Sequence, residues 1–205
     1  MKYFLSIDQG TTSTRCILFN TDGSIASSHQ IELKQYFPDN NSVEHDPIEI
    51  IDSVNKCIQN VVNDIDVNEI VSIGISNQRE TTVAWSKSTG KPFYNAIVWQ
   101  DTRTQSICDE LIENKRFTEL IKNTGLPIST YFSLSKILWL IENVSEIRSS
   151  LNSDVCFGTI DSWIVYNLTG NFYTDVTNAS RTLMYDLHNT VSYTHLRAHE
   201  TDRYL

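Results

Sequence analysis

The stretch Asp8–Arg15, which reads DQGTTSTR, lies between two apolar runs and decides the fold that the sequence predicts. The runs at residues 3–7 and 15–19 are short and apolar, as expected of two strands joined by a tight loop. Gly10 lets the backbone approach an anion closely, and the hydroxyl groups and Arg15 can donate to phosphate oxygens. Asp8, an acid at a strand end, can hold a hydrated Mg²⁺. The loop predicts a phosphate-binding hairpin, with an ordinary Gly/Thr-rich turn as the alternative.

This loop differs from two common nucleotide-binding motifs. The pattern GxxxxGK[ST] is absent from the chain, so the loop is not a P-loop. The pattern GxGxxG is also absent, and a strand rather than a helix is expected to follow, which excludes a dinucleotide-binding fingerprint.

The rest of the chain alternates strand and helix patterns. Asp46 and Pro47 begin a helix whose apolar residues recur with a period of about 3.6 up to Ile65. Further strands are expected at residues 25–33, 70–76, 81–85 and 93–99. Further helices are expected around residues 107–112, 134–141 and 160–168. This order predicts an α/β domain with a mixed sheet flanked by helices.

The net charge limits the classes of binding partner, and the cysteine content indicates the cellular compartment. The 205 residues carry a formal net charge of −9, which argues against nucleic acid as a partner. No apolar run reaches the length of about 18 residues that a membrane span requires. The four cysteines are widely spaced, as expected of buried thiols in a reducing compartment, and the expected location is the cytoplasm.

A dense polar turn, NQRETT at residues 77–82, follows a predicted strand. Arg79 is a fork of donors and Glu80 a pair of acceptors, so together they can bind neighbouring hydroxyl groups of a polyol. The alternative is an exposed turn in which the two charges pair with each other. Trp99 can form an apolar wall against the polyol or be a core residue, and Tyr131 can be a site residue or a half-buried loop aromatic.

Six short segments carry a resemblance to a known family. They are DQGTTS at 8–13, VEHDP at 43–47, NQRETT at 77–82, NAIVWQ at 95–100, FGTIDSW at 157–163 and TNASRT at 177–182. Over residues 1 to about 189 the chain resembles the N-terminal domain of the FGGY carbohydrate kinases. The NQRETT turn resembles that of the glycerol kinases more than that of kinases for xylulose, gluconate or ribulose.

The resemblance implies a ribonuclease-H-like, actin-like ATPase domain that uses ATP and Mg²⁺. Thr11, Thr12, Ser13 and Arg15 match positions that contact the nucleotide phosphates, and Asp8 matches a position close to the metal ion.

The acceptor positions of the family also have counterparts in this sequence. Arg79, Glu80 and Tyr131 match positions that hydrogen-bond the glycerol hydroxyls, and Trp99 matches the apolar wall. The implied reaction moves the γ-phosphoryl group of Mg·ATP to a terminal hydroxyl, giving sn-glycerol 3-phosphate. Two alternatives stay open: a kinase for another polyol or sugar, and a non-catalytic nucleotide-binding module of the actin or Hsp70 kind.

Two departures from the family pattern define the expected domain organisation. Family members are more than twice this length. Their general base, an Asp in a Gly-Asp-Gln-Gln segment, has no counterpart here, because no Gly-Asp-Gln occurs in this chain. Asp101 and Asp161 do not match that motif, and they are expected to be structural or to support site residues without touching the substrate. The base is expected in a missing C-terminal domain, so the fragment is expected to be inactive alone. Residues 1–190 are expected to be the kinase domain and residues 191–205 a non-native tail. The full-length protein is compatible with a homo-oligomer.

Overall fold

The computed structural model describes residues 2–113, 118–151, 153–189 and 191–192. The chain forms two compact units. The first contains the chain up to Gln35 together with His45–Gln78, and the second contains Tyr36–Glu44 and the chain from Arg79 onward. The expected boundary at residue 190 and residues 193–205 of the expected tail lie outside the described residues.

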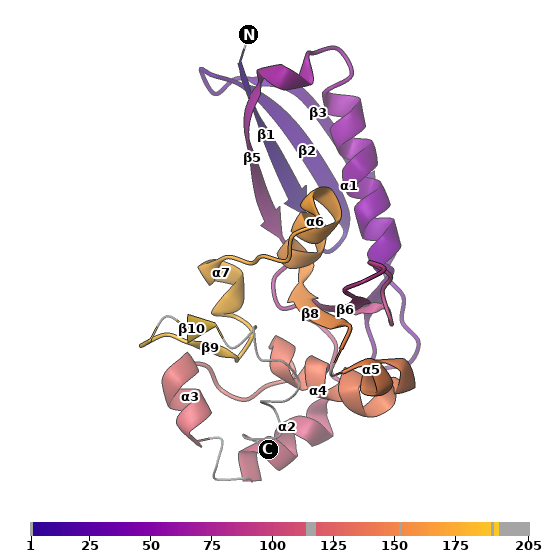
Figure 1. Cartoon of the computed structure of the whole chain (residues 1–205), viewed down its shortest axis with the longest axis vertical. Helices are drawn as coiled ribbons and strands as arrows, with labels where there is room; N and C mark the ends of the chain where they lie inside the picture. The colour runs from indigo at the N-terminus through magenta and orange to yellow at the C-terminus, as the bar shows by residue number, and fades with distance from the viewer. Residues whose placement is uncertain (1, 114–117, 152, 190, 193–205) are drawn as a thin grey trace. The chain divides into compact units, whose positions relative to one another are not determined.

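The first unit is a four-stranded mixed sheet with one long helix. Its strands are ordered β3-β2-β1-β5, with antiparallel pairing throughout β1–β2–β3 and parallel pairing of β1 with β5. Helix α1 packs along β2 and β3, and Figure 1 shows it running beside the sheet. The bounds are β1 Tyr3–Gln9, β2 Ser13–Asn20, β3 Ile25–Glu32, α1 Pro47–Val61, the 3₁₀ turn Val67–Glu69 and β5 Ile70–Asn77.

The predicted capping of α1 is confirmed. The carboxylate of Asp46 accepts a hydrogen bond from the backbone N–H of Ile48 at 2.8 Å, and Pro47 occupies the first helical position. The buried face of the helix repeats with the helical period, and its buried apolar residues include Ile50, Val54, Cys57 and Val61. The helix therefore forms where local sequence and burial agree, although it ends four residues before Ile65.

Strand β5 forms the outer edge of this sheet and is exposed along most of its length. Val71 and Ile73 are 54% and 51% exposed, although Ile73 lies opposite the buried Leu5 in the β1–β5 register. An exposed apolar sheet edge presents unpaired backbone groups to other chains. The edge at β5 therefore carries apolar side chains on the surface of the first unit.

The second unit combines a small sheet with the remaining helices. The strands of this sheet are ordered β4-β7-β6-β8, and β6 pairs antiparallel with both β7 and β8. Of the two residues of β4, Glu44 belongs to the second unit and His45 to the first. The bounds are β4 Glu44–His45, β6 Thr82–Ser86, β7 Ala96–Ile97, α2 Gln105–Glu113, α3 Thr118–Thr124, α4 Ser133–Asn143, α5 Ser145–Ser150, β8 Val155–Thr159, α6 Ile160–Thr169, α7 Val176–Ala179, β9 Tyr185–Asp186 and β10 Val191–Ser192.

Two aromatic residues occupy the centre of the second unit. Trp85 and Trp163 are fully buried, and their ring centroids lie 5.3 Å apart. Gly158 on β8 allows this packing, because a Cβ atom there would lie only 2.8 Å from Trp85 Cη2. The glycine of the FGTIDSW segment is thus required by the core.

Most expected elements of the second unit are present, and one is much shorter. The expected strand at residues 93–99 is reduced to Ala96–Ile97, although the flanking backbone N–H groups of Phe93 and Val98 donate to Ala84 and Val43. Of the elements that the structure describes in this unit, seven have no counterpart among the expected ones: strands β4, β8, β9 and β10 and helices α3, α5 and α7.

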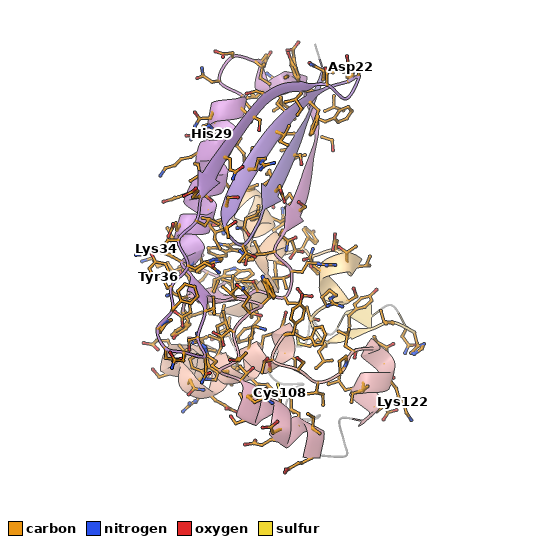
Figure 2. All side chains as sticks on the ribbon, turned by 180° about the vertical axis from the view of Figure 1, so that it is seen from behind. Asp22, His29, Lys34, Tyr36, Cys108 and Lys122 are labelled. Atoms are coloured by element: carbon orange, nitrogen blue, oxygen red, sulfur yellow. The ribbon has the colours of Figure 1, made fainter. Side chains whose placement is uncertain are left out.

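The cysteines are free and buried, as expected: Cys16, Cys57, Cys108 and Cys156. Burial raises the pKa of Cys16 to about 12, and Cys108 lies on α2 (Figure 2). None of the helices in the described part of the chain combines the length and the apolar character that crossing a membrane requires.

Candidate functional site

The predicted phosphate-binding residues lie in or beside the β1–β2 hairpin of the first unit. The backbone N–H of Gly10 donates to the carbonyl oxygen of Ser13 at 2.8 Å, which closes a tight loop between the strands. A Cβ atom on Gly10 would lie 3.3 Å from that same oxygen, so a larger residue would crowd the loop. Thr12 is exposed, and Thr11 and Ser13 are half-buried. The loop thus places three hydroxyl groups beside a tightly turned backbone.

Asp8 and Arg15 face each other across β1 and β2. Both are exposed, but their partners lie elsewhere. Asp8 Oδ1 accepts a hydrogen bond from the Ser76 hydroxyl at 2.7 Å, and Arg15 donates through Nε and Nη2 to Gln30 Oε1 at 2.9 and 2.6 Å. Both partners, on β5 and β3, were missed by the sequence reasoning because they are distant in the chain.

Asp8 is the residue that the sequence predicts close to a metal ion. Among the residues that the structure describes, no three His, Cys, Asp or Glu side chains lie close enough to hold a metal ion together. Mg²⁺ commonly binds through one or two carboxylates, with water and phosphate oxygens as its other ligands. Asp8 therefore fits a metal ion that arrives with a phosphate group.

Gln78 is buried and supports the hairpin from the end of β5. Its backbone N–H donates to Gln9 at 2.7 Å, and its side-chain Nε2 lies 3.1 Å from His45 Nδ1 and 3.3 Å from the Gly10 carbonyl oxygen. Gln78 belongs to the NQRETT segment, which was expected to be one polar turn, but its contacts are with residues of the first unit.

Acidification is expected to destabilise the protein through His45. Burial lowers the pKa of His45 from 6.5 to about 4, against smaller opposing effects of Glu49 and the Thr11 backbone. Between these two values the unfolded chain takes up a proton that the folded chain does not, so the free energy of unfolding falls as pH falls through this window. His45→Asn keeps an acceptor for Gln78 but cannot titrate. Urea unfolding at neutral pH and in this window should show a smaller fall for the variant, and equal falls would contradict the prediction.

Glu80 is one of the predicted acceptor-binding residues, and it lies in the second unit. Its carboxylate is buried and accepts a hydrogen bond from Arg181 Nε at 2.6 Å. The alternative in which Arg79 and Glu80 pair with each other is therefore wrong, and Arg79 is exposed. Glu80 has φ of 62°, which is rare for a residue with a side chain and is concentrated at functional sites.

Trp99 and Tyr131 lie together in the same unit. Their ring centroids are 5.6 Å apart at 64°, and both are half-buried. Trp99 is less buried than Trp85 and Trp163, which are fully buried. Arg181 lies 5.7 Å from the Tyr131 ring centroid. Arg181 thus links Glu80 to Tyr131, and Tyr131 contacts Trp99. Among the described residues, Arg79 has no side-chain contact with these three.

Lys136 supports the Tyr131 loop and was missed by the sequence reasoning. Its Nζ donates to the carbonyl oxygens of Thr130, Tyr131 and Phe132 at 2.6, 2.9 and 3.2 Å. Burial lowers its pKa to about 8, while Asp101 and Glu80 act in the opposite direction. The sequence feature that could have revealed this role is the presence of a lysine among the apolar residues of the helix expected at 134–141.

Asp101 and Asp161 bond within the fold, in keeping with the expected structural roles. Asp101 belongs to a buried ion pair with Arg103. Asp161 accepts hydrogen bonds from the hydroxyls of Thr159 and Thr174, and burial raises its pKa.

Comparisons with known proteins agree with this arrangement. A probable glycerol kinase of Caenorhabditis elegans is 47% identical over 198 residues, which cover 92% of this chain and 39% of that protein. The crystal structure of Plasmodium falciparum glycerol kinase with ADP matches with a TM-score of 0.84 at 40% identity, covering 94% of this chain and 39% of that one. The ligand-bound xylulose kinase of Lactobacillus acidophilus matches with a TM-score of 0.83 at 25% identity, covering 94% and 38%.

These matches confirm the predicted α/β fold with sheets flanked by helices, and they show that the chain spans about two fifths of the length of these relatives. The sequence model described as the FGGY family of carbohydrate kinases, N-terminal domain, matches residues 3–194. The chain therefore belongs to the FGGY family of carbohydrate kinases: it matches the N-terminal domain of that family and is similar to a probable glycerol kinase.

Proposed function

We propose that the protein to which this chain belongs transfers the γ-phosphoryl group of ATP to a terminal hydroxyl of glycerol, giving sn-glycerol 3-phosphate. The observation that carries the proposal is the cluster of Glu80, Tyr131 and Trp99, which puts an acceptor, a phenol and an apolar ring within one small region. The similarity to two glycerol kinases supports it.

In this proposal, the first unit binds the phosphates of the nucleotide. Thr11, Thr12, Ser13 and Arg15 bind the phosphates, and Asp8 stands next to the metal ion. Mg²⁺, when bound, neutralises charge on the transferred phosphoryl group. The tight hairpin at Gly10 supports this assignment because backbone and hydroxyl donors are brought close together there.

The second unit binds the acceptor, glycerol. Arg79 donates to a hydroxyl oxygen, Glu80 accepts from a hydroxyl group, and Tyr131 supplies a further polar contact. The ring of Trp99 covers the C–H face of the polyol. Neighbouring hydroxyl groups on a three-carbon chain suit one donor fork and one carboxylate. A xylulose kinase shares the fold, so the choice of glycerol depends on these side chains.

The general base is assigned to a C-terminal domain. The chain contains no Gly-Asp-Gln sequence, and its buried Asp101 and Asp161 are engaged by other groups. Without a base to take the hydroxyl proton, the 205-residue chain is expected to bind but not to turn over.

The test compares this chain with an extended chain, in which the sequence continues into the C-terminal part that its relatives have. We expect no ATP-dependent phosphorylation of glycerol by the first and clear activity by the second, measured by product formation with glycerol, xylulose and gluconate as alternative acceptors.

Three outcomes would contradict the proposal in different ways. Turnover by the 205-residue chain would show that the base is within it. Preference of the extended chain for xylulose or gluconate would overturn glycerol as the acceptor. ATP binding without phosphorylation of any acceptor would favour the non-catalytic nucleotide-binding module.

A further inference from the structure

Arg181 contacts two of the four proposed acceptor-binding residues. It follows the short helix α7, and its backbone N–H donates to the carbonyl oxygen of Asn178 at 3.0 Å. Its Nε donates to Glu80 Oε1 at 2.6 Å, and its guanidinium carbon lies 5.7 Å from the ring centroid of Tyr131 and 5.1 Å from that of Phe132. One side chain therefore bonds the carboxylate and stacks near the phenol.

Glu80 needs such a partner because its conformation and burial are both costly. The residue has φ of 62°, and a residue with a side chain in that region costs on the order of 1–3 kcal/mol. Its carboxylate is only 3% exposed. The backbone is held by the hydroxyls of Ser133 and Thr82, which donate to the Glu80 carbonyl oxygen at 3.1 and 3.2 Å. The carboxylate is held by Arg181.

The segment that carries Arg181 is attached to the same helix end as the Tyr131 loop. The backbone N–H of Leu134 donates to the carbonyl oxygen of Thr182 at 2.9 Å. Lys136 holds the three carbonyl oxygens of residues 130–132. Three segments far apart in sequence therefore meet at the start of α4, and Arg181 connects the side chains that they carry.

We propose that Arg181 is a positioning residue, which orients Glu80 and Tyr131 for the hydroxyl groups of the acceptor without contacting the acceptor itself. The inference rests on the proposed function, because it places an acceptor at these two residues. Arg181 donates a hydrogen bond to Oε1 of Glu80. The other carboxylate oxygen, Oε2, accepts no hydrogen bond from the residues that the structure describes. That oxygen is directed to the acceptor, since a carboxylate held at one oxygen presents the other in a defined place.

The test measures equilibrium binding of glycerol, xylulose and gluconate to the extended chain by calorimetry, without nucleotide. Arg181→Met keeps an apolar stem and removes the charged donor. We expect it to raise the Kd of the preferred acceptor about 10- to 100-fold, the range that corresponds to loss of a charged hydrogen bond. Arg148→Met, at an exposed arginine that donates to the carbonyl of Glu142, is the matched control and should leave the Kd unchanged.

Two further measurements separate positioning from a general loss of structure. In a Glu80→Gln background, Arg181→Met should add less than about a twofold change, because residues that act through one contact are not additive. Guanidinium ion added to Arg181→Met should restore part of the affinity, since the native side chain is 31% exposed and its place can be reached. If Arg181→Met does not fold, Arg181→Lys, which keeps the charge but lacks the Nε donor, replaces it and should give an intermediate weakening.

The outcomes distinguish this proposal from the proposed function. An unchanged Kd in Arg181→Met, or fully additive effects with Glu80→Gln, would overturn the positioning role even if glycerol is the acceptor. A larger effect on xylulose or gluconate binding than on glycerol binding would overturn glycerol as the acceptor and support the positioning role. If the unsubstituted extended chain binds none of the three acceptors, both proposals fail.

Discussion

Replacement of Arg103 by methionine is expected to lower the free energy of unfolding of this chain by about 3–5 kcal/mol. Arg103 Nη2 donates to Glu44 Oε1 at 2.7 Å and to Asp101 Oδ2 at 2.8 Å, and these carboxylate side chains are 3% and 0% exposed. Burial alone would lower the pKa of Arg103, but the hydrogen bonds to Asp101 and Glu44 raise it above its ordinary value. Removal of the cation would leave two buried carboxylates without a counter-charge.

This prediction can be checked by urea unfolding followed by circular dichroism. Arg148→Met, which removes an exposed arginine from the same unit, should change the unfolding free energy by less than about 0.5 kcal/mol. Adding Glu44→Gln to Arg103→Met should recover part of the loss, because one buried charge is then removed. A loss of less than about 1 kcal/mol in Arg103→Met would show that water or rearrangement replaces the cation.

The Arg103 cluster also bears on the candidate acceptor site. Asp101 lies two residues after Trp99, and its Oδ2 accepts the backbone N–H of Val43 at 2.6 Å. The guanidinium carbon of Arg103 lies 4.7 Å from the ring centroid of Trp139 on α4. The cluster thus ties the Trp99 segment to the helix whose first turn supports Tyr131.

Replacement of Asp8 by alanine is expected to lower kcat/KM of the extended chain about 10²- to 10³-fold while leaving stability almost unchanged. Phosphoryl transfer depends on positioning and charge neutralisation, and the loss of one preorganised electrostatic group typically has an effect of this size. Asp8 is exposed, and its hydrogen bond from the Ser76 hydroxyl is its principal contact in the first unit. The fold therefore depends little on this carboxylate.

Asp22→Ala is the matched control for this prediction. Asp22 is another exposed carboxylate that accepts a serine hydroxyl, that of Ser24 at 2.6 Å, and it lies in the β2–β3 turn at the far end of the sheet (Figure 2). Activity of Asp22→Ala should match that of the unsubstituted chain. Full activity in Asp8→Ala would contradict the proposed place of Asp8 next to the metal ion, and a large stability loss would show that its role is structural.

Several features of the fold could be predicted because their causes are local. The hairpin of β1 and β2 follows from two apolar runs around Gly10, and α1 follows from Asp46, Pro47 and a helical repeat of buried residues. The failures have tertiary causes. The expected strand at 93–99 is only Ala96–Ile97, and its neighbours in the sheet, β4 and β6, come from distant parts of the chain.

The candidate sites show the same division. The residues of the β1–β2 loop are contiguous, so their grouping could be predicted from the sequence. The NQRETT segment was predicted as one polar turn, but Gln78 supports the first unit and Glu80 belongs to the second. The TNASRT segment contributed to the resemblance without a role for Arg181, because Arg181 and Glu80 are 101 positions apart.

The sequence by itself determined the α/β class, the family and the β1–β2 hairpin, because caps, periodicity and glycine turns act over a few neighbouring residues. Only the tertiary structure decided which charges meet. Glu80 pairs with Arg181 rather than Arg79, and Arg103 joins Glu44 to Asp101. Such pairs exist because burial removes water from charged groups and leaves them stable only beside a partner, and that partner is chosen by the packing of distant segments.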